Sequence, residues 1–290
     1  MSVISIPLSS EKTILIGNGF DLSLNLKTSF KHFFDSTIFK DFAIKHPIGN
    51  WLDNNKNDSE KWMDLEMLLT SLSLGEQSKY NFENFSNRNP GLQDLYDQFN
   101  TLKKVLISYL NTLDFSVNNE IRKSKAYSFI ESHKDSDPMF INFNYTPTVL
   151  NILEDLNHHS FAGAKHVHIH GSLKGNDVVI GAGAYEKSKS EFVFLKKSSQ
   201  AALNPFDILS NLLMTEKIFV FGHTMGQPDH SYFKSFFAHI LSESQNKKEI
   251  TIITKNDRSR KDIMDHLEIL TDNRVQDLRV HHELKFEFNS

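Results

Sequence analysis

Five residues at the end of an apolar run, Gly17-Asn18-Gly19-Phe20-Asp21, have the composition of a phosphate or nucleotide site. The run Ile14–Ile16 before them is typical of a buried strand, and glycines let backbone N–H groups approach an anion without a Cβ in the way. Asp21 could bind ribose hydroxyls or cap a turn. The stretch also fits a strand-to-helix connection that holds no ligand, with the next helix expected around Thr28–Asp35.

A second stretch of this kind, Phe143-Asn144-Tyr145, ends another apolar run. The Asn144 side chain offers donors and an acceptor, so it could hydrogen-bond a ribose or hold a water molecule. It could equally be a plain turn residue before the helix expected over Thr146–Asn157. In that helix we expect Thr146 to be the N-terminal cap and Pro147 to occupy the opening turn.

A third stretch carries histidines at alternate positions, His166, His168 and His170, followed by Gly171. If the segment is a strand, the three rings share one face, because side chains alternate along a strand. A His-x-His pair could hold Zn or Fe. One histidine could instead be a general base, and His170 is best placed because it ends the strand. The third interpretation is a partly buried, hydrogen-bonded set without chemistry.

A fourth junction, Phe221-Gly222-His223, also follows an apolar run. Gly222 would let the chain pass close to a bound ligand, because it has no Cβ. Asp229, a few residues further on, could contact a ligand as well. We favour an N-cap role for Asp229, at a helix that begins near Ser231.

A single carboxylate, Glu66, interrupts an apolar helix face in the middle third of the chain. Glu66 and Trp62 are four residues apart and therefore share that face. A carboxylate in such a place is either buried and functional or lies at the rim of the face, and we favour function. Tyr185, beside the glycine turn Gly181-Ala182-Gly183, could stack on a ligand, but core packing explains it equally well.

The elements that must position these residues alternate along the chain. Nearly continuous apolar runs predict strands covered on both faces in a parallel sheet, whereas the last segment alternates and predicts an edge strand or hairpin. Between residues 50 and 135 apolar residues recur every three to four positions, which predicts a helical insertion. We expect one α/β domain over 1–290 with a doubly wound sheet, in which ligands bind at the carboxyl ends of the strands. The expected strands are Thr13–Ile16, Met139–Phe143, His166–His170, Val178–Ile180, Lys217–Phe221, Ile250–Thr254 and Val280–Phe288, and the further helices are Trp62–Leu72, Leu95–Leu113, Asn204–Thr215, Ser231–Gln245 and Arg258–Asp272.

Composition excludes several kinds of site. The 290 residues include no Cys, so the chain cannot supply thiolate zinc ligands, iron–sulfur ligands, disulfides or a cysteine nucleophile. The net charge of −4 gives no overall attraction to nucleic acid or anionic lipid. The 24 Phe against 7 Tyr and 2 Trp indicate aromatic-rich helix packing. Neither a leader peptide nor an apolar run of about 18 residues is evident, so we expect a cytoplasmic protein that uses no membrane.

Taken together, the motifs resemble the bacteriophage abortive-infection protein AbiH family. The resemblance covers about Lys12–Phe237, and the family usually has a glycine where Asn25 stands. The stretches that carry it are Gly17-Asn18-Gly19-Phe20-Asp21, Leu26–Phe30, Trp62-x-Asp64-x-Glu66, Phe143-Asn144-Tyr145-Thr146, His168-x-His170-Gly171 and Phe221-Gly222-His223.

The order of the motifs is also similar to that of sirtuin-like NAD hydrolases, which implies a Rossmann-like (sirtuin-like) sheet. The resemblance implies that Gly17 and Gly19 hold the nucleotide, that Asn144 positions ribose and water, and that His170 is the base. Two departures matter: the zinc-binding cysteines of deacetylating sirtuins are absent, which argues against peptide deacylation, and Thr146 replaces the Asp common in the hydrolases. The other residues expected at the nucleotide are Asn18, Phe20, Asp21, Glu66, Tyr145, Gly222, His223 and Asp229.

The resemblance therefore implies an anti-phage effector that hydrolyses its substrate NAD to nicotinamide and ADP-ribose without a metal. Two alternatives stay open: a nucleotide-sensing module that binds without turnover, and a metal-dependent nuclease or phosphoesterase that combines the three histidines with Asp21 or Glu66. We expect a small-molecule nucleotide as ligand, a trigger derived from phage or supplied by a partner protein, and assembly into a homo-oligomer.

Overall fold

The computed structural model describes residues 11–55, 65–74, 92–157, 165–183, 190–243 and 247–289. The chain divides into two compact units. Unit 1 comprises Met1–Leu26, Phe115–Ile169 and Asn204–Ser290, and unit 2 comprises Lys27–Asp114 and His170–Leu203. Trp62, Asp64 and Tyr185, which the sequence singled out, lie outside the described residues.

Unit 1 is built on a parallel sheet, in which six strands are described. Their order is β3-β2-β1-β6-β7-β8, and every neighbouring pair runs parallel. This is the strand order of the Rossmann fold, and it reverses direction between β1 and β6, where such sheets place their ligands. The doubly wound, Rossmann-like α/β fold predicted from the sequence is therefore confirmed. The strands are β1 (Lys12–Ile16), β2 (Met139–Asn142), β3 (His166–His168), β6 (Lys217–Phe221), β7 (Glu249–Thr254) and β8 (Glu283–Phe288).

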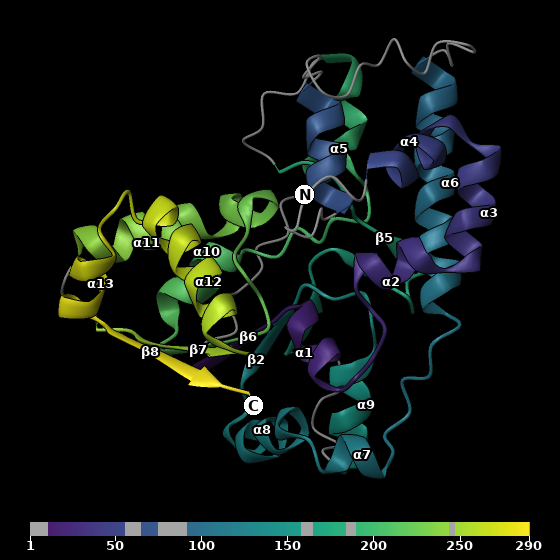
Figure 1. Ribbon diagram of the computed structural model, residues 1–290. Coiled ribbons are helices and arrows are strands. Elements are labelled where there is room, and N and C mark those ends of the chain that lie inside the picture. Colours follow the sequence, from purple (N-terminus) through teal and green to yellow (C-terminus); the bar gives the residue numbers. More distant parts are fainter. Residues whose placement is uncertain are drawn as a thin grey trace, which may run out of the picture. The chain divides into compact units, whose positions relative to one another are not determined.

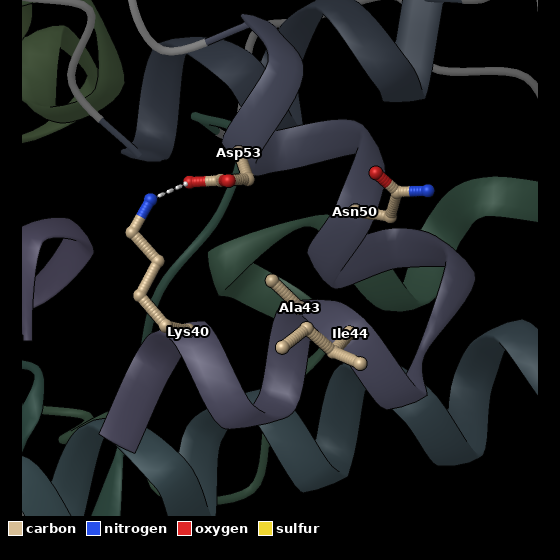
Figure 2. A pocket seen from close by; sticks show the side chains of 5 residues that line it. All are labelled: Lys40, Ala43, Ile44, Asn50 and Asp53. Carbon is tan, nitrogen blue, oxygen red and sulfur yellow. Dashed lines mark hydrogen bonds and ion pairs between the residues drawn. The ribbon is translucent and has the colours of Figure 1, made fainter. Parts of the chain in front are cut away.

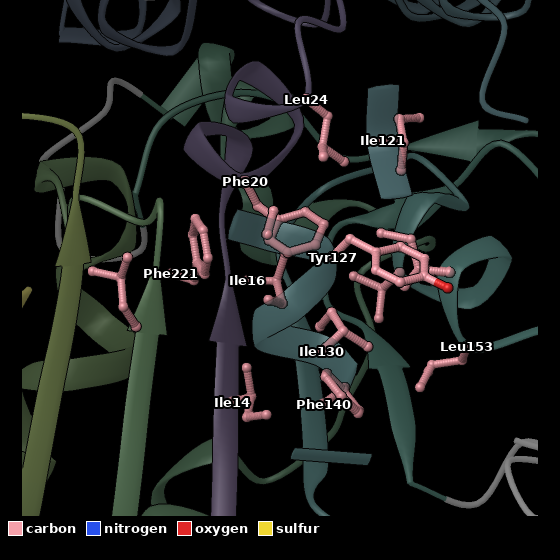
Figure 3. Packing of buried hydrophobic residues seen from close by; sticks show 14 residues of the cluster. Ile14, Ile16, Phe20, Leu24, Ile121, Tyr127, Ile130, Phe140, Leu153 and Phe221 are labelled. Carbon is pink, nitrogen blue, oxygen red and sulfur yellow. The ribbon is translucent and has the colours of Figure 1, made fainter. Parts of the chain in front are cut away.

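Helices cover both faces of this sheet, as Figure 1 shows. On one face Ile14, Phe140 and Phe221 join an apolar cluster with residues of α1, α7, α8 and α9, drawn in Figure 3. On the other face Thr13 donates a hydrogen bond to Asn211 of α10, and α11, α12 and α13 continue that layer. The bounds are α1 (Asn18–Ser23), α7 (Asn119–Arg122), α8 (Lys125–His133), α9 (Thr148–Asp155), α10 (Ile208–Met214), α11 (His230–Ser242), α12 (Asp257–Leu270) and α13 (Val275–His281).

Unit 2 is mainly helical, and rings fill much of its interior. The ring of Phe33 packs against the rings of Phe39 and Tyr109, with centroid distances of 5.1 and 5.6 Å. Such packing accounts for part of the phenylalanine excess. Ser29 and Ser36 cap two consecutive helices, because each side chain accepts a backbone N–H of the first turn. The elements are α2 (Phe30–Asp35), α3 (Thr37–Lys45), α4 (Pro47–Asn55), α5 (Leu65–Leu74), α6 (Leu92–Leu110), β4 (Gly171–Ser172), β5 (Asp177–Val178), and the short 3₁₀ helices η3 (Ser190–Leu195) and η4 (Lys197–Ser199).

The structure corrects several predicted elements. The helix predicted around Thr28–Asp35 is present as α2, but the glycine stretch itself begins another helix, α1, at Asn18. The strand predicted over His166–His170 ends at His168, and Val178 belongs to an antiparallel pair with β4 instead of the parallel sheet. The last strand does lie at the sheet edge, but it pairs parallel to β7 and forms no hairpin with it.

The start of that last strand was placed too early. Val280 belongs to α13, which extends to His281, and β8 begins at Glu283. A segment that alternates apolar and polar residues can therefore contain a helix end as well as a strand.

No helix in the described ranges is both long enough and apolar enough to cross a membrane.

Candidate functional site

The carboxyl ends of β1 and β6 meet through glycine backbones. The Gly17 N–H donates to the carbonyl of Phe221 at 3.0 Å, and the Gly19 N–H donates to the carbonyl of Gly222 at 2.9 Å. A Cβ on Gly19 would lie 2.7 Å from the Gly222 Cα, so two chain segments touch here. The glycines at this junction therefore allow close packing, and the N–H groups of Gly17 and Gly19 are bonded within the protein.

Gly222 is the residue that makes this contact possible. Its φ is +67°, a conformation that side chains disfavour, and a Cβ there would lie 2.2 Å from the Phe20 backbone nitrogen. Phe20 itself is fully buried, and its ring packs edge-on against Phe221 at 5.0 Å. Phe20 is thus a core residue in this structure, whereas Asn18, at the start of α1, is partly exposed.

Asp21 is a buried carboxyl that faces three polar side chains. The Thr146 hydroxyl donates to Oδ2 of Asp21 at 2.6 Å. Burial raises the pKa of Asp21 from 3.8 to about 6, and the side chains of Thr146, Thr148 and Asn144 lower it in part. Within the described ranges, Oδ1 of Asp21 has no hydrogen-bond partner at normal distance. Asp21 is 0% exposed, and its bond to Thr146 connects it to the segment after β2.

Thr146 does not act as the helix cap that the sequence predicted. The N-cap position of α9 is Pro147, and no side chain of the described residues bonds to the helix there. Since the Thr146 hydroxyl is used for Asp21, its role is to connect the start of α9 with α1.

Asn144 is held by hydrogen bonds to its backbone and its side chain. Its N–H donates to Oδ1 of Asn142 at 2.9 Å, and its side-chain amide donates to the carbonyl of Gly17 at 3.2 Å. Its own carbonyl accepts from Nδ1 of His168 at 2.7 Å. The sequence interpretation missed Asn142, although two asparagines spaced by two residues at the end of a strand point to the same face.

The histidines of β3 are neutral and differ in their partners. The Asn142 side-chain amide donates to Nε2 of His166 at 3.3 Å. Burial, together with a smaller contribution from the neighbouring His168, lowers the pKa of His166 from 6.5 to about 3. Burial also lowers the pKa of His168. Among the described residues no group of three His, Asp or Glu side chains is arranged to hold a metal ion.

His223 and Asp229 form a pair within the loop after β6. The Met225 N–H donates to Nδ1 of His223 at 3.0 Å, so the proton of the ring lies on Nε2, which is 3.2 Å from Oδ2 of Asp229. Asp229 occupies the N-cap position of α11, but its side chain makes no capping bond to described residues. The prediction that Asp229 caps this helix by its side chain is therefore wrong, because the carboxylate faces His223 instead.

Unit 2 contains the two remaining predicted site residues. Glu66, on α5, forms an ion pair of 2.8 Å with Lys197, and the two side chains are 10% and 3% exposed. The sequence interpretation missed Lys197, since a lysine in a Ser- and Lys-rich stretch resembles a surface residue. His170 is also buried, and its carbonyl accepts the Val179 N–H at 2.8 Å.

The predicted residues thus fall into two sets. Unit 1 holds Asn144 together with Gly17, Asp21, Thr146 and the partly exposed Tyr145. Unit 2 holds His170 and Glu66, so the two residues predicted as catalytic, Asn144 and His170, belong to different units.

A hollow of about 430 Å³ lies elsewhere in unit 2, and Figure 2 shows it. Lys40 on α3 reaches Asp53 on α4 across it, at 2.6 Å. Its other lining residues are Ala43, Ile44 and Asn50. None of these residues was predicted to bind a ligand, and the ion pair serves to join two helices.

Comparison with known proteins gives one positive result. A family model described as "Bacteriophage abortive infection AbiH" matches residues 13–253. The match includes every residue discussed above for the site. A search of curated proteins found no match to this chain.

Proposed function

This chain belongs to the AbiH family of bacteriophage abortive-infection proteins, and on that premise we propose that it hydrolyses NAD to nicotinamide and ADP-ribose. The bond between nicotinamide and ribose breaks through a state with oxocarbenium character. A site for this reaction has to hold the ribose, exclude bulk water and orient one water molecule.

The observation that carries the proposal is the fixation of Asn144 at the carboxyl end of β2. Both backbone groups and the side chain of Asn144 are hydrogen-bonded, so its position is set before any ligand binds. It lies one strand from the point where the strand order reverses, which is where open parallel sheets bind nucleotides. We assign Asn144 to the ribose and its attacking water.

The backbone contacts assign the remaining roles differently from the sequence prediction. Because the Gly17 and Gly19 N–H groups are bonded to the loop after β6, we assign the phosphates of NAD to side chains and not to these two groups. Because Asp21 is enclosed, we assign it to positioning Thr146 and Asn144. The family resemblance implies that His170 is the base, but His170 belongs to unit 2, so this role stays a prediction, as do the trigger and the homo-oligomer.

The test is chromatography of NAD incubated with purified protein. We expect nicotinamide and ADP-ribose from the wild type. Asn144→Ala should lower turnover about 10²–10³-fold, because it removes a group that stabilises the transition state. If His170 is the base that the resemblance implies, His170→Ala should lower turnover about 10²–10⁴-fold. Asn119→Ala is the matched control, since Asn119 is exposed on α7 and should have no effect.

A nucleotide-binding module without turnover is the second candidate. It is favoured by the buried polar cluster of Asp21, Thr146 and Asn144, because such a cluster can position a binding surface as well as a catalytic one. In that case NAD would raise the melting temperature of the wild type and would be recovered unchanged. Turnover by the wild type would exclude the binding module, and full turnover by both Asn144→Ala and His170→Ala would exclude the assigned hydrolase site.

A further inference from the structure

The hydrogen bond between His168 and Asn144 determines which ring nitrogen of His168 carries the proton. A carbonyl oxygen only accepts, so Nδ1 of His168, at 2.7 Å from the Asn144 carbonyl, must be the N–H donor. The other nitrogen, Nε2, then carries the lone pair. Nε2 has no hydrogen-bond partner among the residues that the structure describes, and the side chain is partly exposed.

His166, two residues earlier on the same face, is in the opposite situation. The Asn142 amide oxygen accepts the Asn144 N–H, so its NH₂ group faces Nε2 of His166 and donates to it. The lone pair of His166 is therefore occupied. Of the two histidines on β3, only His168 presents an acceptor nitrogen with no protein partner in the described part of the chain.

We propose that Nε2 of His168, in place of His170, accepts the proton of the attacking water in the NAD hydrolysis, an inference that rests on the proposed function. The water oxygen bonds to C1′ of the ribose, and the bond from C1′ to the nicotinamide nitrogen breaks. Its electron pair leaves with nicotinamide, and the proton of the water passes to Nε2. The resulting imidazolium keeps its Nδ1–H bond to the Asn144 carbonyl, which stabilises the positive charge.

This arrangement has the geometry of a base and its orienting group. In enzymes that use a histidine base, a hydrogen bond to one ring nitrogen fixes the tautomer and leaves the other nitrogen free to take a proton. Burial keeps the pKa of His168 below its ordinary value, so the ring is neutral and able to accept a proton at neutral pH. Asn144 therefore has two roles: its side chain binds the ribose, and its carbonyl orients the base.

The decisive variant is His168→Asn. The asparagine NH₂ occupies nearly the place of Nδ1 and can still donate to the Asn144 carbonyl, but it has no basic nitrogen. We expect a loss of NAD turnover of about 10²–10⁴-fold, with NAD affinity measured by calorimetry unchanged. His168→Ala should be partly rescued by added imidazole. The same change at an exposed histidine of α11, His239→Asn, is the control and should have wild-type activity.

The outcomes separate this inference from the proposed function. Wild-type turnover together with near-normal turnover of His168→Asn would overturn the base assignment alone and leave His168 as a positioning residue. Absence of nicotinamide release by the wild type would overturn the proposed function, and the base assignment with it.

Chemical labelling gives an independent readout. Diethylpyrocarbonate, which modifies neutral accessible histidines, should label His168 and not His166, and NAD should protect His168. Equal labelling of both histidines, or none at His168, would also overturn the inference.

Discussion

The Thr146 hydroxyl donates a 2.6 Å hydrogen bond to the carboxylate of Asp21, a residue 125 positions away in the sequence. The bond joins the start of α9 to α1 at the carboxyl edge of the sheet in unit 1. Because both side chains are buried, the carboxyl depends on this donor and on its neighbours, and not on water, for stabilisation of its charge.

The stability of the fold should fall as pH rises through the titration range of Asp21. Burial raises its pKa from 3.8 to about 6, so the folded chain binds this proton more tightly than the unfolded chain. Between about pH 4 and 6 the folded state therefore holds more protons, and the free energy of unfolding decreases with rising pH. A difference of about two pKa units corresponds to about 3 kcal/mol.

Urea unfolding of wild type and Asp21→Asn across this pH range measures the effect. The variant cannot ionise, so its stability relative to the wild type should increase by up to about 3 kcal/mol from pH 4 to pH 7. Parallel pH curves for the two proteins would show that the carboxyl of Asp21 is not perturbed by burial.

Removing the Thr146 hydroxyl should destabilise the protein most where Asp21 is charged. Thr146→Val leaves Oδ2 of Asp21 without its donor and should cost about 1–3 kcal/mol above pH 6. Thr146→Ser keeps the hydroxyl and is the control, expected to retain most of the stability. A loss for serine with none for valine would mean that the methyl group, and not the hydrogen bond, matters.

Gly222→Ala should destabilise unit 1 by about 2–5 kcal/mol. The residue has a φ of +67°, and a Cβ would lie 2.2 Å from the Phe20 nitrogen, so the change adds backbone strain to overpacking. Gly175→Ala is the matched control in an exposed loop, where the nearest atom would be 3.4 Å away. Thermal denaturation of the two variants checks this, and a melting temperature of Gly222→Ala equal to that of the control would contradict it.

Asn25 occupies a left-handed position at the end of α1, with φ of +60°. The Leu26 N–H bonds to the carbonyl of Asp21 and the Asn25 N–H to that of Leu22, which is the Schellman pattern that favours glycine. This explains why asparagine, which adopts the left-handed conformation more readily than most residues, can stand at this position. Asn25→Ala should lose about 1 kcal/mol and Asn25→Gly almost nothing. A more stable alanine variant in chemical denaturation would argue against this conformation.

The buried ion pair of Glu66 and Lys197 should be strongly coupled. Glu66→Gln removes the carboxylate that lies 2.8 Å from the buried ammonium group of Lys197, which should cost about 3–5 kcal/mol. The double variant Glu66→Gln with Lys197→Met removes both charges and should recover much of that loss. A double-mutant cycle with additive losses would indicate that the two groups do not interact in solution.

Sequence patterns located every strand of the six-stranded sheet, although β3 ends and β8 begins at other residues than predicted. Strands such as Lys217–Phe221 are apolar throughout because they are buried on both faces, and burial is a property that a local run of residue types reflects. The motifs around Gly17 and Asn144 were found for the same reason. Each follows an apolar run, so each lies at the carboxyl end of a strand.

The assignment of donors and acceptors was decided by tertiary structure alone. Whether the Gly17 N–H is available to a ligand depends on its bond to Phe221, and the tautomer of His168 depends on the Asn144 carbonyl. These contacts exist because β1 pairs in register with β6, and β2 with β3, over long separations in the chain. Local spacing places such residues at one edge of a sheet, but the packing of distant segments determines which of their polar groups are already bonded and which remain for chemistry.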